Sequence, residues 1–210
     1  MSEVFLILHG WGGNKPAHWQ EHLAAKLTEA GAEVHYPKMP TSMSPDPAAW
    51  QDALHAALEA IPTDATLTVL AHSLGAINWM RHAALSQQAG SQQAGTRPGP
   101  QADRVLLVAP PYVIREIPPL DAPPGAANFF PPTLSKAGVV AVSRQTVLVA
   151  SDTDDYATYD QSAAYADGLG IEIQKLPGGG HISPYYGYGE WPWVLEWALR
   201  RADLPPQPNK

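Results

Sequence analysis

The chain has 210 residues, of which 45% are hydrophobic, and this is enough for one domain with a substantial buried core. Its formal net charge of −7 argues against nucleic acid or another polyanion as a partner. Cysteine is absent, which excludes disulfides, thiolate metal sites and a cysteine nucleophile.

The first residues carry no targeting or membrane signal. The apolar run over residues 4–8 is too short for a signal sequence or a membrane span, and no basic residues precede it. We therefore expect a soluble protein in a reducing, cytoplasmic setting, with no membrane partner.

Apolar runs typical of buried parallel strands alternate with helical patterns along the first half of the chain. Asp46 followed by Pro47 is typical of a helix start, and Gly31 of a helix end. The expected elements are strands at 4–8, 33–36 and 66–71, and helices at 16–30, 47–60 and 76–85.

Two segments interrupt this alternation. The unit Ser-Gln-Gln-Ala-Gly occurs twice in tandem over residues 86–95, which predicts a low-complexity inserted loop at 86–100 without chemical function. Residues 110–134 are rich in proline and contain Tyr112, Phe129 and Phe130. A long segment of this kind between core elements is typical of a lid or a pocket loop, or of disorder.

The alternation resumes in the second half. The expected elements are strands at 104–109, 146–150 and 171–175, and helices at 159–169 and 191–201. Alternating strands and helices predict a single α/β domain over residues 1–210. We expect a mostly parallel sheet of about six strands with helices on both faces.

The segment Ala71-His72-Ser73-Leu74-Gly75 joins an expected strand to an expected helix. A serine between small residues at such a turn is typical of a nucleophile elbow, although position 71 is Ala where the usual pattern has Gly. The hydroxyl would lie above the carboxyl edge of the sheet, where parallel sheets bind ligands. Ser73 is therefore the candidate nucleophile.

A serine hydroxyl needs a base within hydrogen-bond reach and a third group that orients the base. After the last expected strand, three consecutive glycines precede His181, which makes this residue the candidate base. The strand at 146–150 leads into a loop with three candidate acids, Asp152, Asp154 and Asp155. Their spacing does not decide among them, because aspartates in such turns often cap helices or bond their own backbone.

Backbone N–H groups could stabilise the oxyanion of a tetrahedral intermediate. The N–H of Leu74 follows the nucleophile at a helix start. The glycine-containing loop over residues 9–13 follows the first strand, and its Trp11 N–H is the second candidate donor. We expect His9 in the same loop to be a hydrogen-bonded structural residue.

Together these motifs resemble the α/β-hydrolase superfamily. More narrowly, the chain is similar to the small serine hydrolases of the retinoblastoma-binding-protein-like group and their bacterial relatives. The matching motifs are His9-Gly10-Trp11-Gly12, His18-Trp19, Ala71-His72-Ser73-Leu74-Gly75, Val108-Ala109-Pro110-Pro111, Asp154-Asp155 and Gly180-His181-Ile182. The resemblance implies a three-layer α/β sandwich without a large cap domain. It also implies that the acid is Asp155, which Tyr156 follows here in place of the family's proline.

The function expected from these residues and this resemblance is hydrolysis of small carboxylic esters through an acyl-enzyme, without a cofactor. Trp11, Tyr112, Phe129 and Phe130 would line an apolar pocket for short or medium uncharged acyl groups. The sequence carries no signal for a particular oligomeric state.

Two other interpretations compete with this one. His18 and His22 lie four residues apart on an expected helix, but the zinc-protease pattern and a third ligand are missing, so we expect no metal. A binding protein that retains the hydrolase scaffold is the stronger alternative. In that case Trp191, Trp193 and Trp197 would form an exposed aromatic patch, whereas a closing helix packed on the sheet would bury them.

Overall fold

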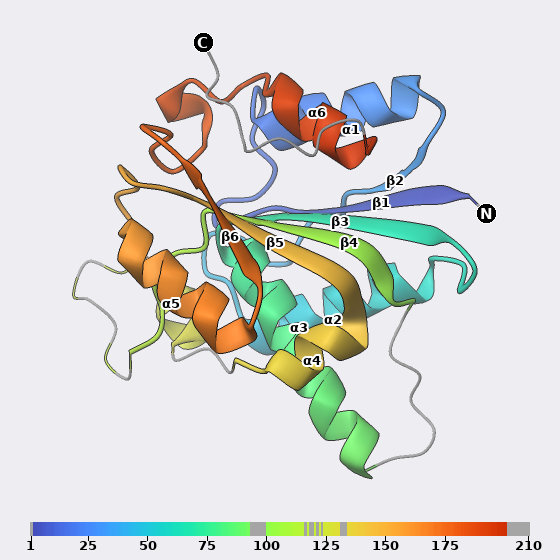
Figure 1. Ribbon diagram of the computed structural model, residues 1–210, viewed down its shortest axis with the longest axis horizontal. Helices are drawn as coiled ribbons and strands as arrows, with labels where there is room; N and C mark the ends of the chain where they lie inside the picture. Colours follow the sequence, from blue (N-terminus) through green and yellow to red (C-terminus); the bar gives the residue numbers. More distant parts are fainter. Residues whose placement is uncertain are drawn as a thin grey trace.

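The computed structural model describes residues 2–92, 100–115, 117, 120, 122, 124–130 and 134–200. Its centre is a six-stranded sheet with the strand order β2-β1-β3-β4-β5-β6, in which every neighbouring pair is parallel (Figure 1). The strands are β1 (Glu3–Leu8), β2 (Glu33–His35), β3 (Thr66–His72), β4 (Ala102–Val108), β5 (Ser143–Ser151) and β6 (Glu172–Leu176). The predicted parallel α/β sheet is thus confirmed.

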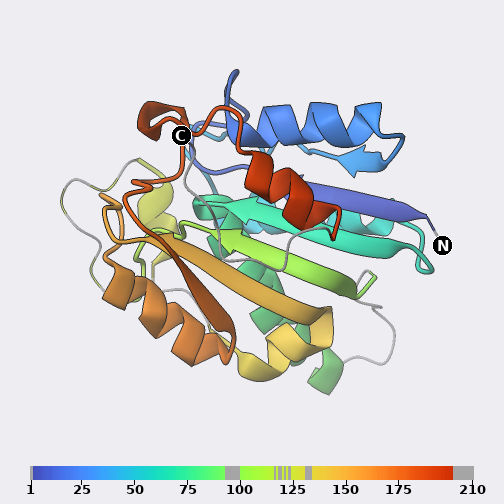
Figure 2. The same cartoon turned by 45° about the horizontal axis from the view of Figure 1, so that its top comes forward.

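Helices cover both faces of the sheet and complete a three-layer sandwich (Figures 1 and 2). One face carries α1 (Trp19–Glu29) and α6 (Pro192–Ala198). The other carries α2 (Pro47–Glu59), α3 (Leu74–Gln92), α4 (Lys136–Val142) and α5 (Tyr159–Leu169). In the described residues, segment 110–134 adds as regular structure only the short 3-10 turn η1 (Ala126–Phe129).

The sheet separates two hydrophobic cores because successive side chains of a strand point to opposite faces. In β1, Leu6 contributes to the core under α2 and α3, while Phe5 and Ile7 contribute to the core under α1 and α6. The closing helix joins the second core through buried Trp193 and Trp197, next to buried Trp191. These tryptophans therefore pack inside the protein and do not form an exposed patch.

Two helices differ from the sequence-based expectation. Helix α3 continues to Gln92, so part of the predicted insertion is helical, since glutamine and alanine favour helices. Residues 93–99 of that insertion lie outside the described part of the chain. Helix α4 was not predicted. Ser135 caps it, and Gly138 lies so close to the Ala83 carbonyl oxygen that a Cβ at this position would clash with it.

Because all strands run in one direction, the loops that follow β1, β3, β5 and β6 meet at one edge of the sheet. This edge lies toward the left in Figure 2, to which the strand arrows point. Within the described residues, no helix is both long and apolar enough to span a membrane.

Candidate active site

Ser73 lies on a sharp turn between β3 and α3. Its φ is +54°, which is unusual for a residue with a side chain, and its N–H donates to the Val108 carbonyl at 2.9 Å. Close packing holds the turn in place. A Cβ on Gly75 would lie 2.5 Å from the Leu8 carbonyl oxygen, and one on Gly10 would lie 2.7 Å from the Cβ of Ser73. These contacts explain why glycine is needed two residues after the serine and at position 10, which packs against it.

The loop after β6 brings His181 to this serine. The Nε2 atom of His181 lies 3.0 Å from the hydroxyl oxygen of Ser73, within hydrogen-bond distance. The loop is fastened to the loop after β5, because Gly178 N–H donates to the Asp152 carboxylate at 2.8 Å and Gly180 N–H to the Thr153 hydroxyl at 3.0 Å. These two hydrogen bonds fix the turn that carries His181.

The carboxylate that contacts His181 belongs to Asp154. Its Oδ2 lies 2.9 Å and its Oδ1 3.0 Å from Nδ1 of the imidazole. The Asp154 side chain is only 3% exposed, and its Oδ1 also accepts the N–H of Tyr156 at 2.8 Å. Such a buried carboxylate favours the imidazole tautomer that carries its proton on Nδ1 and leaves Nε2 free to accept a proton from Ser73.

The expectation for Asp155 is therefore corrected. Its carboxylate lies on the exposed side of the loop and accepts a hydrogen bond from the hydroxyl of Tyr186. This hydrogen bond raises the pKa of Tyr186, so the phenol is neutral and acts as the donor. The two neighbouring aspartates differ because the turn from Asp154 to the Tyr156 N–H directs the first side chain inward and leaves the second outside.

Side chains from two distant elements hold the backbone around His181. The carbonyl oxygen of His181 lies 2.9 Å from Nε2 of His72, and Trp19 Nε1 donates to the Ile182 carbonyl at 2.9 Å. Burial lowers the pKa of His72 well below its usual value, and the neighbouring His18 adds to this effect. The neutral His72 therefore donates through Nε2–H. This hydrogen bond links His72, which precedes Ser73 in the chain, to the backbone of His181.

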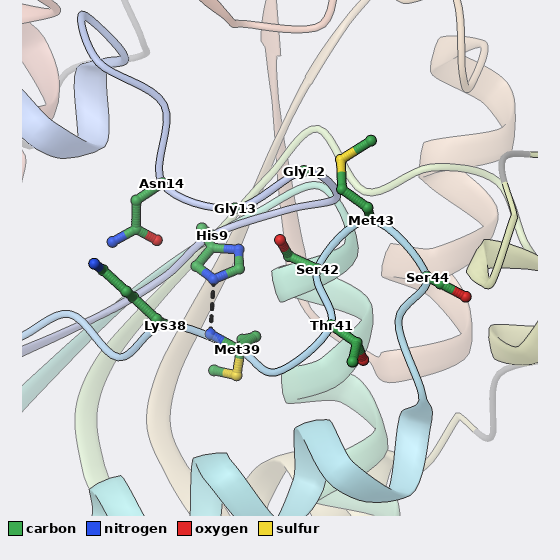
Figure 3. Close-up of a pocket in the computed structure, with 10 residues that line it drawn as sticks. All are labelled: His9, Gly12, Gly13, Asn14, Lys38, Met39, Thr41, Ser42, Met43 and Ser44. Atoms are coloured by element: carbon green, nitrogen blue, oxygen red, sulfur yellow. Dashed lines mark hydrogen bonds between the residues drawn. The ribbon is translucent and has the colours of Figure 1, made fainter.

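Contacts with residues 39–44 fix the glycine-containing loop after β1. Gly12 N–H donates to the Ser42 carbonyl at 3.0 Å, and the indole of Trp11 donates to the Met43 carbonyl at 3.1 Å. The Nε2 atom of His9 accepts the N–H of Met39 at 2.9 Å, as the dashed line in Figure 3 shows. As expected, His9 is thus a hydrogen-bonded structural residue, and burial lowers its pKa.

Two pockets adjoin this loop. The smaller, of about 580 Å³, lies between the loop and residues 38–44 (Figure 3). The larger, of about 980 Å³, contains Ser73 and His181. Three of the four predicted pocket residues, Trp11, Tyr112 and Phe130, line this larger pocket.

The fourth predicted pocket residue, Phe129, lies elsewhere. It is 3% exposed and packs edge-on against Trp50, with 5.5 Å between the ring centroids. Adjacent residues at the end of the 3-10 turn η1 point in different directions. Phe130 consequently faces the pocket, while Phe129 belongs to the core.

Several pocket residues were missed by sequence reasoning. The ring of Tyr156 lies 4.4 Å from that of His181, and Lys15 and Arg115 also line the pocket. No local motif marks these residues. Only the position of Tyr156, directly after the aspartates, pointed toward the site.

The histidines considered as metal ligands have other contacts. Nδ1 of His18 accepts the N–H of Gln20 at 3.2 Å and caps α1. His22 lies near Glu190, with 3.8 Å between Nδ1 and Oε1. In the part of the chain that the structure describes, no three His, Asp or Glu side chains gather as a metal site would require.

Comparisons with known proteins find solved structures of the same fold. The structure resembles that of the ydeN gene product from B. subtilis, with a TM-score of 0.72 and 19% identity over 96% of this chain and 98% of that one. It also resembles Est1E from Butyrivibrio proteoclasticus, with a TM-score of 0.64 and 16% identity over 95% and 86% of the chains. For polyneuridine aldehyde esterase the TM-score is 0.62, with 12% identity over 97% and 100%.

At these identities the likeness establishes the fold, which is that of the α/β hydrolases. Curated protein sequences give no match to this chain. The profile of the serine hydrolase family, however, matches residues 5–199. This range includes Ser73, Asp154 and His181. The chain therefore belongs to the serine hydrolase family.

Proposed function

We propose that this serine hydrolase is a carboxylesterase that works through an acyl-enzyme. The observation that carries the proposal is the continuous chain of contacts from the Ser73 hydroxyl to His181 and on to buried Asp154, at 3.0 and 2.9 Å. This is the arrangement that activates a serine hydroxyl, which is otherwise a poor nucleophile at neutral pH. Polyneuridine aldehyde esterase, one of the structural neighbours, supports this proposal.

In the first half of the reaction, the Ser73 hydroxyl attacks the ester carbonyl while Nε2 of His181 takes its proton. The Asp154 carboxylate stays ionised and stabilises the imidazolium that forms. The tetrahedral intermediate then collapses, and His181 returns the proton to the departing alcohol. An ester of Ser73 remains.

In the second half, His181 takes a proton from water, and the resulting hydroxide attacks the acyl-enzyme. Collapse of the second tetrahedral intermediate releases the carboxylic acid and restores the Ser73 hydroxyl. His181 thus serves as the base and then as the acid in both halves, and in the second half it returns its proton to Ser73.

Backbone N–H groups would hold the oxyanion in both steps. Leu74 is the first residue of α3, and an N–H in that position has no acceptor within its helix. Trp11 lines the same pocket, in a loop whose Gly12 and Gly13 amides are already bonded to backbone carbonyls. Each such donor typically contributes about 10²–10³ to turnover.

Turnover of p-nitrophenyl esters from acetate to octanoate tests the proposal. We expect release of p-nitrophenol with a burst when deacylation is slow. The Ser73→Ala variant should lose about 10⁶-fold in kcat. A folded protein that hydrolyses none of these esters, or a Ser73→Ala variant with wild-type turnover, would contradict the assignment.

A further inference from the structure

The pocket that contains Ser73 differs in charge from the rest of the molecule. The chain carries a net charge of −7, yet two cations, Lys15 and Arg115, line this pocket. Among the described lining residues the one carboxylate is that of Asp155, and it accepts the hydroxyl of Tyr186. An anionic ligand would therefore meet positive charge here.

Arg115 is held on the aromatic wall of the pocket. One guanidinium N–H donates to the Tyr112 carbonyl at 3.2 Å, and the guanidinium carbon lies 5.2 Å from the Tyr112 ring and 5.9 Å from the Phe130 ring. Cation–π contacts of this kind help to hold the guanidinium near the aromatic rings. The hydrogen bond to the Tyr112 carbonyl uses one of the five N–H donors of Arg115, so a pair of parallel N–H groups remains for a ligand.

Lys15 lies at the glycine-containing loop. Its ammonium nitrogen is 6.0 Å from the centroid of the Trp11 ring. Its Cε and Nζ atoms would be 3.0 and 3.3 Å from a Cβ on Gly12. Neither Lys15 nor Arg115 forms an ion pair with a carboxylate in the described ranges of the chain.

We infer that the enzyme prefers esters that carry a carboxylate, which Arg115 and Lys15 would bind while Ser73 attacks the ester carbonyl. This inference rests on the proposed function and names its substrate class. The planar fork of an arginine matches a carboxylate with two parallel hydrogen bonds. The bound carboxylate takes no part in the bond changes, so the reaction remains water plus ester giving acid plus alcohol. A carboxylate on the acyl part would differ from the expected preference for uncharged acyl groups, whereas a carboxylate on the alcohol part would not.

Three esters of matched size test this preference. They are p-nitrophenyl valerate, which is neutral; the p-nitrophenyl monoester of glutarate, with a carboxylate on the acyl part; and the valerate of a carboxylated nitrophenol, with a carboxylate on the alcohol part. Each rate is divided by hydroxide-catalysed hydrolysis of the same ester to remove intrinsic reactivity. We expect one anionic ester to exceed neutral valerate about tenfold in kcat/KM at low ionic strength, with the advantage reduced by salt. The favoured arm identifies the side on which the carboxylate binds.

The variants Arg115→Gln and Lys15→Gln should each lower the ratio of anionic to neutral kcat/KM about three- to tenfold. Arg144→Gln is the matched control. Arg144 lies at the start of β5, at the opposite end of the strand from the site, where its Nε is 3.8 Å from Asp103. That ratio should not change in this control.

The outcomes separate the two proposals. If valerate is hydrolysed in a Ser73-dependent manner but no anionic ester is preferred, or if the preference survives both variants, the inference is wrong and the esterase assignment stands. If none of the three esters is hydrolysed, both are wrong.

Discussion

Replacement of Asp154 by asparagine tests which carboxylate orients the candidate base. The variant has nearly the same size, and its amide oxygen can still accept the N–H of Tyr156, which Asp154 Oδ1 accepts at 2.8 Å. The amide NH₂ then faces Nδ1 of His181. It forces Nδ1 to act as acceptor, so that Nε2 carries the proton and cannot take one from Ser73.

The loss should therefore be large although the fold is unchanged. A wrong imidazole tautomer in such a triad costs about 10⁴ in kcat, which corresponds to about 5 kcal/mol at roughly 1.36 kcal/mol per tenfold. Asp155→Asn is the matched control because it alters the adjacent carboxylate. Its exposed side chain can still accept the Tyr186 hydroxyl, so we expect less than about a threefold change.

Steady-state hydrolysis of p-nitrophenyl butyrate measures both effects, with circular dichroism and urea unfolding to establish that each variant is folded. The reasoning fails if Asp155→Asn is the more damaging change. It also fails if Asp154→Asn, well folded, retains more than about a tenth of the wild-type kcat.

Three further predictions follow from other contacts. His72→Phe removes the hydrogen bond to the carbonyl of His181 and should lower kcat about 10- to 100-fold with little change in KM. His72→Gln, whose amide can donate to this carbonyl, should recover part of the loss. Equal kcat in both variants would contradict this positioning role. Gly75→Ala places a Cβ 2.5 Å from the carbonyl oxygen of Leu8 and should lower the free energy of unfolding by about 1–3 kcal/mol, measured by urea titration. A variant as stable as the wild type would contradict this prediction and show that the turn can relax. Burial is the main cause that lowers the pKa of His82 from its usual value of about 6.5 to about 4. Between about pH 6.5 and 4, His82 is therefore protonated in the unfolded chain but neutral in the folded protein. This difference should lower the free energy of unfolding by about 3 kcal/mol as the pH falls from 6.5 to 4. The variant His82→Leu should flatten the pH dependence of the unfolding free energy, and an unchanged slope would refute the linkage.

The parts of the fold that depend on local pattern could be predicted. Apolar runs identified the strands, and a parallel sheet places the residues that follow them at one edge. The sequence alone therefore predicts Ser73 and His181 at this edge. The small residues around Ser73 also predicted the tight turn, and the structure shows that only a small residue fits at Gly75, beside β1.

The choice of acid could not be predicted in this way. It depends on a bond between the Asp154 carboxylate and the Tyr156 N–H, which sets the direction of one side chain within an irregular loop. The resemblance selected Asp155 by position, whereas the carboxylate that contacts His181 belongs to Asp154, one residue earlier. The assignment of Phe129 failed for a similar reason, because neighbouring residues at the end of a 3-10 turn face different environments.

Helix α4 was missed because its sequence is rich in β-branched valines, which favour strands. Its capping by Ser135 and the close packing of Gly138 on α3 override that preference. Lys15 and Arg115 converge on the pocket from segments far apart in sequence, and only the folded chain brings them together.

Labelling by a fluorophosphonate probe, followed by intact mass and peptide mapping, tests the activated serine most directly. The probe reacts with a serine only when a base takes the hydroxyl proton, and it does not depend on the choice of substrate. We predict one adduct per chain, located on Ser73, with no adduct in Ser73→Ala and strongly slowed labelling in folded His181→Ala. A folded wild-type protein that gains no adduct, or one modified at a different serine, would contradict the account.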